Sequence, residues 1–281
     1  MLSDTKVIAI DYNQDASVVQ ANELVRSKQD ELTLLEAKLI RLAISQVVKD
    51  DTDLKTYSCS IVELVQFLNI SSKNIYSEIQ TLTQELIRKC IYIKTPNPKK
   101  PNEPNYKLFH WIDTIEYSDG IITFKLSDGL KPYLTGLEKL FTMYSYHALL
   151  TLPTNYSIRF YELMCSYERL VIRQHSESYN HIPIAKNEIL FTIDELREIF
   201  NCRDKYPNTG KFIQRVIEPS IEAVIKQDVM YVSYRTITGG RGGKITHIVF
   251  KWMSPLEVVR ERAKRALEKK RVAPFYFPIS D

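Results

Sequence analysis

The spacing of apolar residues predicts most helices and strands in the first part of the chain. Residues 33–48 carry apolar side chains at helical intervals, and Thr33 with Glu36 forms a capping box, which marks the start of a helix. Residues 57–60 are predicted as a short strand, and residues 61–68 as a short helix. A second apolar stripe at helical spacing predicts a longer helix and consists of Ile75, Ile79, Leu82 and Leu86.

Alternating and proline-rich patterns follow that helix. Residues 91–94 alternate like a strand, and the proline-rich segment 95–105 is interpreted as a mobile loop that carries Lys99 and Lys100. The strands LFHWIDTIEYS, at 108–118, and IITFKL are joined by Asp119-Gly120, a strong hairpin signal. The segment 133–146 is apolar at helical intervals and is expected to bridge the two halves.

The second part of the chain repeats this order of elements. Residues 157–173 have one apolar face and predict a counterpart of the first helix, and the polar insertion 174–188 precedes a strand and a short helix. A further helix buries Phe212, Ile213, Val216 and Ile217, and we expect a kink or break at Pro219 because proline removes a backbone hydrogen bond. An alternating hairpin closes the unit, and its basic residues at or near the glycine-rich tip are Arg235, Arg241 and Lys244.

A short repeat connects the two parts. CSIVELVQFLNI at 59–70 and FTIDELREIFNC at 191–202 share an isoleucine, a glutamate and a leucine at a constant offset. Each copy follows an amphipathic helix and precedes a second helix and a hairpin, which is the plan of a winged helix. The sequence therefore predicts an α+β fold of two tandem winged-helix domains related as an internal repeat, and winged helices in tandem indicate binding to two neighbouring stretches of duplex DNA.

Composition and charge agree with this prediction. The chain has 281 residues, 44% of them hydrophobic, which is enough for two domain cores. The net charge is +4, and residues 260–271 alone carry seven basic and two acidic side chains. Two further basic stretches, 71–107 and 203–251, coincide with the second helix and hairpin of each unit, where a phosphate backbone would lie.

The sequence gives little support for a catalytic site, a metal site or a membrane-spanning segment. The stretch Gly-Gly-Arg-Gly-Gly-Lys lacks the serine or threonine of a phosphate-binding loop and opens a strand. The four cysteines are far apart and suit reduced structural thiols, and Asp50, Asp51 and Asp53 suit a solvated loop. We expect no cofactor, no metal and no enzymatic activity. No long apolar run or cleavable leader is present, so a cytoplasmic protein without membrane contact is expected.

Several longer segments resemble a known family. They are LTLLEAKLIRLAI, FKLSDGLKPYLTGL, FTMYSYHALLTLPTNYSIRFYELM and KFIQRVIEPSIEAV. These segments look like the initiator replication proteins of theta-replicating, iteron-containing bacterial plasmids, and the resemblance spans roughly residues 20–255 in matching order. It implies an N-terminal winged helix at 1–140 for DNA binding and dimerisation, a C-terminal winged helix at 141–255 that is the principal reader of iterons, and a basic tail at 256–281.

The resemblance also implies roles for individual residues. The family's main base-reading helix matches residues 209–218, where Lys211, Gln214 and Arg215 are expected to contact bases. The equivalent helix of the first unit has a polar face of Lys73, Asn74, Ser77 and Gln80. The residues expected to hold phosphates are Lys99, Lys100, Arg241 and Lys244.

The partners implied by the resemblance are origin DNA, the host replication initiator and helicase, and a second copy of the chain in a monomer–dimer equilibrium. Melting of an adjacent AT-rich region and repression of the chain's own gene are implied too. One alternative is a winged-helix transcriptional regulator without initiator activity. A rolling-circle nickase is disfavoured, because no two of the five histidines are two residues apart as its metal site requires.

Overall fold

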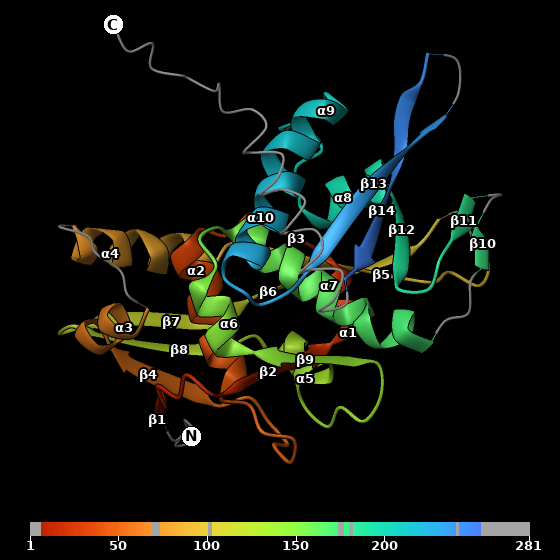
Figure 1. The fold of residues 1–281 in the computed structure, drawn as a ribbon. Coiled ribbons are helices and arrows are strands. Elements are labelled where there is room, and N and C mark those ends of the chain that lie inside the picture. The colour runs from red at the N-terminus through yellow and green to blue at the C-terminus, as the bar shows by residue number, and fades with distance from the viewer. Residues whose placement is uncertain are drawn as a thin grey trace, which may run out of the picture.

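The computed structural model describes residues 7–68, 74–100, 103–173, 177–179, 182–239 and 242–253. Within these ranges the chain forms helices and small sheets arranged as two units in contact (Figure 1). None of the helices in these ranges is long and apolar enough to cross a membrane. All four cysteines are free, as expected for structural thiols.

The N-terminal unit is built around helix α2 (Leu34–Ser45). The Thr33 hydroxyl accepts a hydrogen bond from the Glu36 N–H and the Glu36 carboxylate accepts one from the Thr33 N–H, so the predicted capping box is confirmed. The other helices are α1 (Asn22–Arg26), α3 (Ile61–Phe67), α4 (Ile75–Leu86), α5 (Lys131–Leu134), which follows the short helix η1 (Asp128–Leu130), and α6 (Tyr146–Thr151). The α4 stripe predicted from sequence is confirmed, because Ile79, Leu82 and Leu86 are buried.

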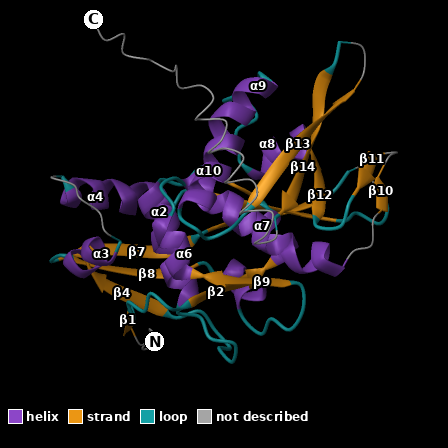
Figure 2. Ribbon diagram, in the orientation of Figure 1, coloured by secondary structure: helices purple, strands orange, loops and turns teal. Residues whose placement is uncertain are grey.

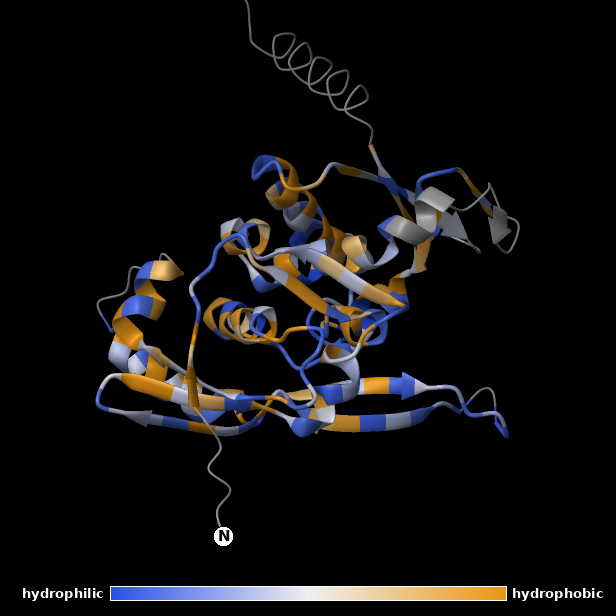
Figure 3. Ribbon diagram, turned by 90° about the horizontal axis from the view of Figure 1, so that it is seen from below, coloured by the Kyte–Doolittle hydropathy of each residue, from blue (hydrophilic) through white to orange (hydrophobic). Residues whose placement is uncertain are grey.

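Three sheets belong to this unit. Strands β1 (Val7–Ala9), β4 (Thr56–Ser60), β8 (Ile121–Leu126) and β7 (Ile112–Ser118) form one sheet in that order, with β1 parallel to β4 and the other pairs antiparallel. Strands β3 (Lys28–Gln29), β5 (Cys90–Thr95) and β6 (Asn105–His110) form the second. Strand β2 (Ser17–Ala21) pairs with β9 (Phe141–Ser145) in the third. In Figure 3 the strands carry alternating hydrophilic and hydrophobic colours, as sheets with one buried face require.

Two sequence predictions in this unit are wrong. The strand expected over 108–118 is two strands in two sheets. The break falls at Trp111, which lies between β6 and β7 in sequence and whose side chain is fully buried. The segment 133–146 is not one helix. It contains the end of α5, a loop and β9. Because β9 pairs with β2, residues 141–145 lie with the N-terminal unit, whereas the sequence assigned them to the C-terminal domain.

The C-terminal unit begins on α7 (Asn155–Arg173), which lies between the β2–β9 ribbon and the sheet of the second unit (Figure 2). That sheet has the order β12 (Glu188–Thr192), β14 (Lys244–Trp252) and β13 (Val232–Gly239), all antiparallel. The polar insertion contains the small hairpin β10 (Glu177–Tyr179) and β11 (Ile182–Ile184). Helix α8 (Ile193–Ile199) carries the second copy of the sequence repeat.

One long helical segment follows α8. It consists of α9 (Thr209–Phe212), a π-helical turn η2 (Ile213–Ile217) and α10 (Glu218–Lys226), which packs on α7. Pro219 lies in the first turn of α10 and has no N–H to donate to a carbonyl of the preceding turn. The expected disturbance at Pro219 is therefore present as a wide turn just before the proline, and the helical path continues beyond it.

A buried charged network joins helix α2 of the N-terminal unit to α7. Arg41 on α2 donates to both carboxylate oxygens of Glu162 on α7, at 2.8 and 3.0 Å, and neither side chain is exposed. Tyr144 and Arg159 also donate to this carboxylate. Burial raises the pKa of Glu162, but the charge and hydrogen bonds of Arg41 outweigh it and hold the pKa below its usual range.

Two ion pairs connect the units at their surface. Lys94 on β5 pairs with Glu198 on α8, and Lys205 pairs with Glu31 at 2.7 Å. These side chains are between 27% and 50% exposed, so each pair contributes at most about 1 kcal/mol. Most of the contact between the units comes from α7, which packs on both α1 and α10.

Candidate nucleic-acid interface

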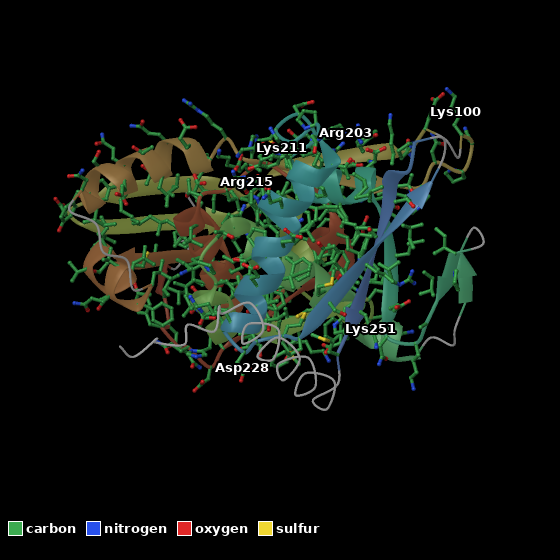
Figure 4. All side chains as sticks on the ribbon, turned by 45° about the horizontal axis from the view of Figure 1, so that its top comes forward. Lys100, Arg203, Lys211, Arg215, Asp228 and Lys251 are labelled. Carbon is green, nitrogen blue, oxygen red and sulfur yellow. The ribbon has the colours of Figure 1, made fainter. Side chains whose placement is uncertain are left out.

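The long helix of the C-terminal unit presents three polar side chains to solvent. Lys211, Gln214 and Arg215 are exposed, whereas Phe212 and Val216, which directly follow Lys211 and Arg215, are fully buried. Neither Lys211 nor Arg215 makes an ion pair within the described part of the chain. These three residues, which the sequence singled out together, therefore lie on one open side of one helix, as Figure 4 shows for Lys211 and Arg215.

The start of this helix is fixed by a side-chain cap and by hydrogen bonds from Arg197. The Asn208 side chain accepts a hydrogen bond from the Lys211 N–H at 2.9 Å and so caps α9. Arg197 on α8 donates to the Pro207 carbonyl at 2.8 Å and to the Thr209 hydroxyl at 3.4 Å. Its guanidinium also lies 5.7 Å from the centre of the buried Phe212 ring. Arg197 thus joins the short helix of the repeat to the first turn of the long helix.

The tip of the β13–β14 hairpin needs glycine. Gly242 and Gly243 have φ angles of +99° and +62°, a region that other residues adopt only with strain. Lys244 follows them, is exposed and opens β14 opposite Gly239. This cation therefore lies at the tip, as predicted, while Arg241 lies outside the described residues.

Arg235 is not at this tip, and its predicted position is wrong. It faces Val249 in the middle of the hairpin, four residues before Gly239, which is about 13 Å of extended chain. Its guanidinium pairs with Glu188 at 2.9 Å and donates to the Pro183 carbonyl at 3.0 Å. Burial raises the pKa of Glu188, but hydrogen bonding to Arg235 and to a backbone N–H gives a net lowering. Arg235 instead connects the inserted hairpin to the sheet.

Helix α4 presents a comparable polar surface in the first unit, but its start has no side-chain cap. Ser77 and Gln80 are exposed on the side opposite the buried stripe, as the helical wheel predicted. Asn74 precedes the helix and is exposed, but its side chain makes no capping bond. Lys73 lies outside the described residues.

The loop between β5 and β6 presents two lysines. The Asn97 side chain accepts hydrogen bonds from the N–H groups of Lys99 and Lys100, at 3.1 and 3.2 Å, which shapes the loop into a turn. Both lysines are exposed, and Lys100 pairs with Glu103 at 2.8 Å. This hairpin is the first unit's equivalent of the β13–β14 hairpin.

Pattern reasoning missed three residues near these surfaces. Arg203 is exposed in the turn between α8 and α9 and lies on the same side of the molecule as Lys211 and Arg215 (Figure 4). Tyr76 on α4 is 55% exposed and lies next to the polar side chain of Ser77 in sequence. Arg197 was missed because its hydrogen-bond partners, the Pro207 carbonyl and the Thr209 hydroxyl, lie ten or more residues away in sequence. The basic count over 203–251 was the only sequence signal, and it indicated Arg203 alone.

The expected basic tail at 256–281 lies outside the described residues. The same is true of part of the polar insertion, whose described residues are 177–179 and 182–188. The surface that the structure describes therefore consists of two helices, two hairpins and the α8–α9 turn.

Two family models match the chain. One is described as Initiator Replication protein, WH1, and matches residues 17–165, and the other as Initiator Rep protein, WH2, and matches residues 192–252. The first match extends past β9 and α6 into α7, in agreement with the pairing of β2 with β9. Together the two matches cover well over half of the chain.

Two individual proteins are similar over most of their length. An Escherichia coli protein named Replication initiation protein is 25% identical over 238 residues, which are 83% of this chain and 68% of that protein. A solved structure of the Pi initiator protein in complex with iteron DNA superposes with a TM-score of 0.57 at 19% identity. It covers 85% of this chain and 98% of its own, and at this identity the likeness shows a shared fold.

Proposed function

The chain belongs to the initiator replication protein family, and from this premise we propose that it initiates replication of a plasmid by binding iterons in the origin. The observation that carries the proposal is the open row of Lys211, Gln214 and Arg215 on the long helix of the second winged helix. Arginine and glutamine make paired hydrogen bonds to base edges in the major groove, and each such pair contributes about 1–3 kcal/mol of discrimination. The Pi initiator protein, whose fold the chain shares, is itself bound to iteron DNA.

The two units divide this task. The C-terminal unit is the principal reader, because its helix is capped by Asn208 and held by Arg197. The N-terminal unit reads a neighbouring groove with Asn74, Ser77 and Gln80, and carries the surface for dimerisation. Lys99, Lys100 and Lys244 contact phosphates, which set the register of the protein on the duplex without reading sequence. The protein acts without catalysis, cofactor or metal.

Binding is proposed to have three consequences. An adjacent AT-rich region melts, the host initiator and helicase are recruited, and the chain represses its own gene when it binds as a dimer. Membership in the initiator replication protein family supports the proposal of these steps.

The primary test is a protection footprint on the DNA that flanks the chain's own gene. Protected blocks that repeat in the same direction at a regular interval are expected. A single inverted repeat without direct repeats would contradict iteron recognition and favour a transcriptional regulator.

A second test separates initiation from regulation. A plasmid that carries the flanking DNA without the gene should replicate in a permissive host only when the protein is supplied in trans. Failure to replicate, together with repression of a nearby promoter, would leave the regulator as the better assignment. A matched plasmid with scrambled repeats serves as the control.

A further inference from the structure

The buried residues of the long helix recur at a spacing that an α-helix does not have. Phe212, Val216, Ser220 and Val224 lie four residues apart, and none is more than 1% exposed. An α-helix has 3.6 residues per turn, so twelve residues would rotate the last of these side chains about a third of a turn away from the first. In a regular α-helix these four side chains would therefore spread over about a third of the helix circumference.

The π-helical turn η2 removes this mismatch. The N–H of Glu218 donates to the carbonyl of Ile213, five residues back, so this turn contains one residue more than an α-helical turn. One residue corresponds to about 100° of rotation, which offsets most of the mismatch. The Ser220 hydroxyl donates to the Val216 carbonyl at 2.6 Å and thereby satisfies an acceptor next to the wide turn.

The same turn arranges the exposed side. Lys211 and Arg215 are four residues apart, both exposed and on the same side of the helix (Figure 4). Gln214 and Arg215 lie inside η2 itself, whereas Lys211 lies before it. The width of this turn therefore sets the angle of Gln214 and Arg215 relative to the helix start.

Pro219 is the residue that enforces the wide turn. In an α-helix its ring would clash with the carbonyl of Arg215, four residues back, and it has no N–H to give to that carbonyl. We propose that Pro219 is a specificity-determining residue, which acts by fixing the wide turn and so the direction in which Gln214 and Arg215 meet the bases. This inference rests on the proposed function and adds the origin of its sequence preference.

One acidic side chain next to this row, that of Glu218, is hydrogen-bonded to the sheet. Glu218 follows η2 and accepts a hydrogen bond from the Tyr234 hydroxyl at 2.6 Å. The bond ties the carboxylate to β13, so the wide turn carries a cation and an amide outward while its neighbouring anion is bound to the sheet.

The test compares base preferences of the full-length chain and its variants. One protected repeat is synthesised with every single base-pair change, and each duplex is titrated with wild type, Pro219→Ala and Pro132→Ala. Pro132 is the matched control, because it is an exposed proline in the first turn of a helix of the other unit, α5. Melting temperatures and binding to an unrelated duplex are measured for each variant.

We expect Pro219→Ala to lose about tenfold or more of the preference at one or two base pairs, with unchanged binding to the unrelated duplex. The Pro132→Ala profile should match wild type. The double variant Pro219→Ala with Arg215→Ala should lose no more preference at those base pairs than Arg215→Ala alone, because the two residues act on the same contacts.

Other results overturn the inference. An unchanged Pro219→Ala profile means that the turn does not set specificity. A uniform loss on all duplexes with a lower melting temperature means that Pro219 serves folding alone. A wild-type chain that prefers no duplex overturns the proposed function as well, which distinguishes the two failures.

Discussion

The two winged helices share an Ile-x-Glu-Leu segment, yet the hydrogen bonds that cap its helix differ between the two copies. In α8 the Glu195 carboxylate accepts the Thr192 N–H and the Thr192 hydroxyl accepts the Glu195 N–H, so a capping box forms. In α3 the preceding residue is Ser60, whose side chain makes no capping bond. The isoleucine and the leucine have the same role in both copies, since Ile61 and Leu64 are buried in α3 and Ile193 and Leu196 are buried in α8. The repeat preserves core positions more faithfully than the local bonds around them.

The contacts around the second helix differ as well. In the C-terminal unit, Arg197 donates a hydrogen bond to the Pro207 carbonyl just before the long helix. The equivalent position of the first copy is Val65, whose side chain has no hydrogen-bond donor. The strand before the repeat also pairs differently: β12 joins the sheet of its own hairpin, whereas β4 joins β1 and β8. The C-terminal unit thus holds its exposed basic helix by local bonds, whereas helix α2 of the N-terminal unit is joined to α7 by the buried pair of Arg41 and Glu162.

This contrast predicts that the units depend on different ion pairs for stability. Arg41→Ala removes both of the short hydrogen bonds from arginine to the buried Glu162 carboxylate and leaves in place the longer arginine bond, from Arg159, so the free energy of unfolding should fall by about 3 kcal/mol. Arg235→Ala in the C-terminal unit should lower it by only about 1 kcal/mol, because that arginine is 42% exposed. Urea denaturation with an unchanged m-value measures both. Equal losses would contradict the contrast.

The largest difference in DNA recognition is expected at the two exposed helices. Arg215→Ala should weaken binding to a repeat duplex by about 1–3 kcal/mol, or about 5- to 150-fold, because it removes a paired contact to a base. Gln80→Ala on α4 should have a smaller effect. Lys226→Ala, an exposed cation at the far end of the same segment, is the control for loss of charge. Fluorescence anisotropy checks this, and equal affinities of Arg215→Ala and wild type would contradict the assignment of Arg215.

The two caps allow a matched comparison of local stability. Thr192→Ala removes the hydroxyl that accepts the Glu195 N–H and should destabilise the fold by about 1 kcal/mol. Ser60→Ala removes a side chain that makes no capping bond, so stability should change by a few tenths of a kcal/mol at most. Thermal denaturation of both variants decides, and a Ser60→Ala effect as large as that of Thr192→Ala would show that α3 is capped after all.

The smallest effect is expected at the hairpin lysines. Lys244→Ala should reduce the slope of log affinity against log salt by about 0.9, the value for one lost phosphate contact. Lys100→Ala should reduce it less, because Lys100 is already paired with Glu103. Titrations at several salt concentrations measure both slopes. A change in base preference in place of a change in slope would mean that these lysines read sequence.

The sequence by itself determined what depends on neighbouring residues. The capping box at Thr33, the buried stripe of α4 and the glycine tip before Lys244 were predicted correctly, because each follows from side chains within a few positions. The tandem winged-helix fold was predicted as well, since its order of helices and strands is written in the hydrophobic periodicity and repeated along the chain.

Only the tertiary structure decided how distant segments combine. Periodicity predicts a strand over 108–118, but the sheets available on either side of Trp111 divide it in two, and pairing with β2 makes a strand of residues 141–145. Arg235 was placed by its carboxylate partner Glu188, 47 residues away in sequence. Pro219 predicted a disturbance in the helix, but only the structure shows that it is a wide turn in which the Glu218 N–H donates to the Ile213 carbonyl. Local sequence fixes the preferences of each segment, and burial against the rest of the chain selects among them.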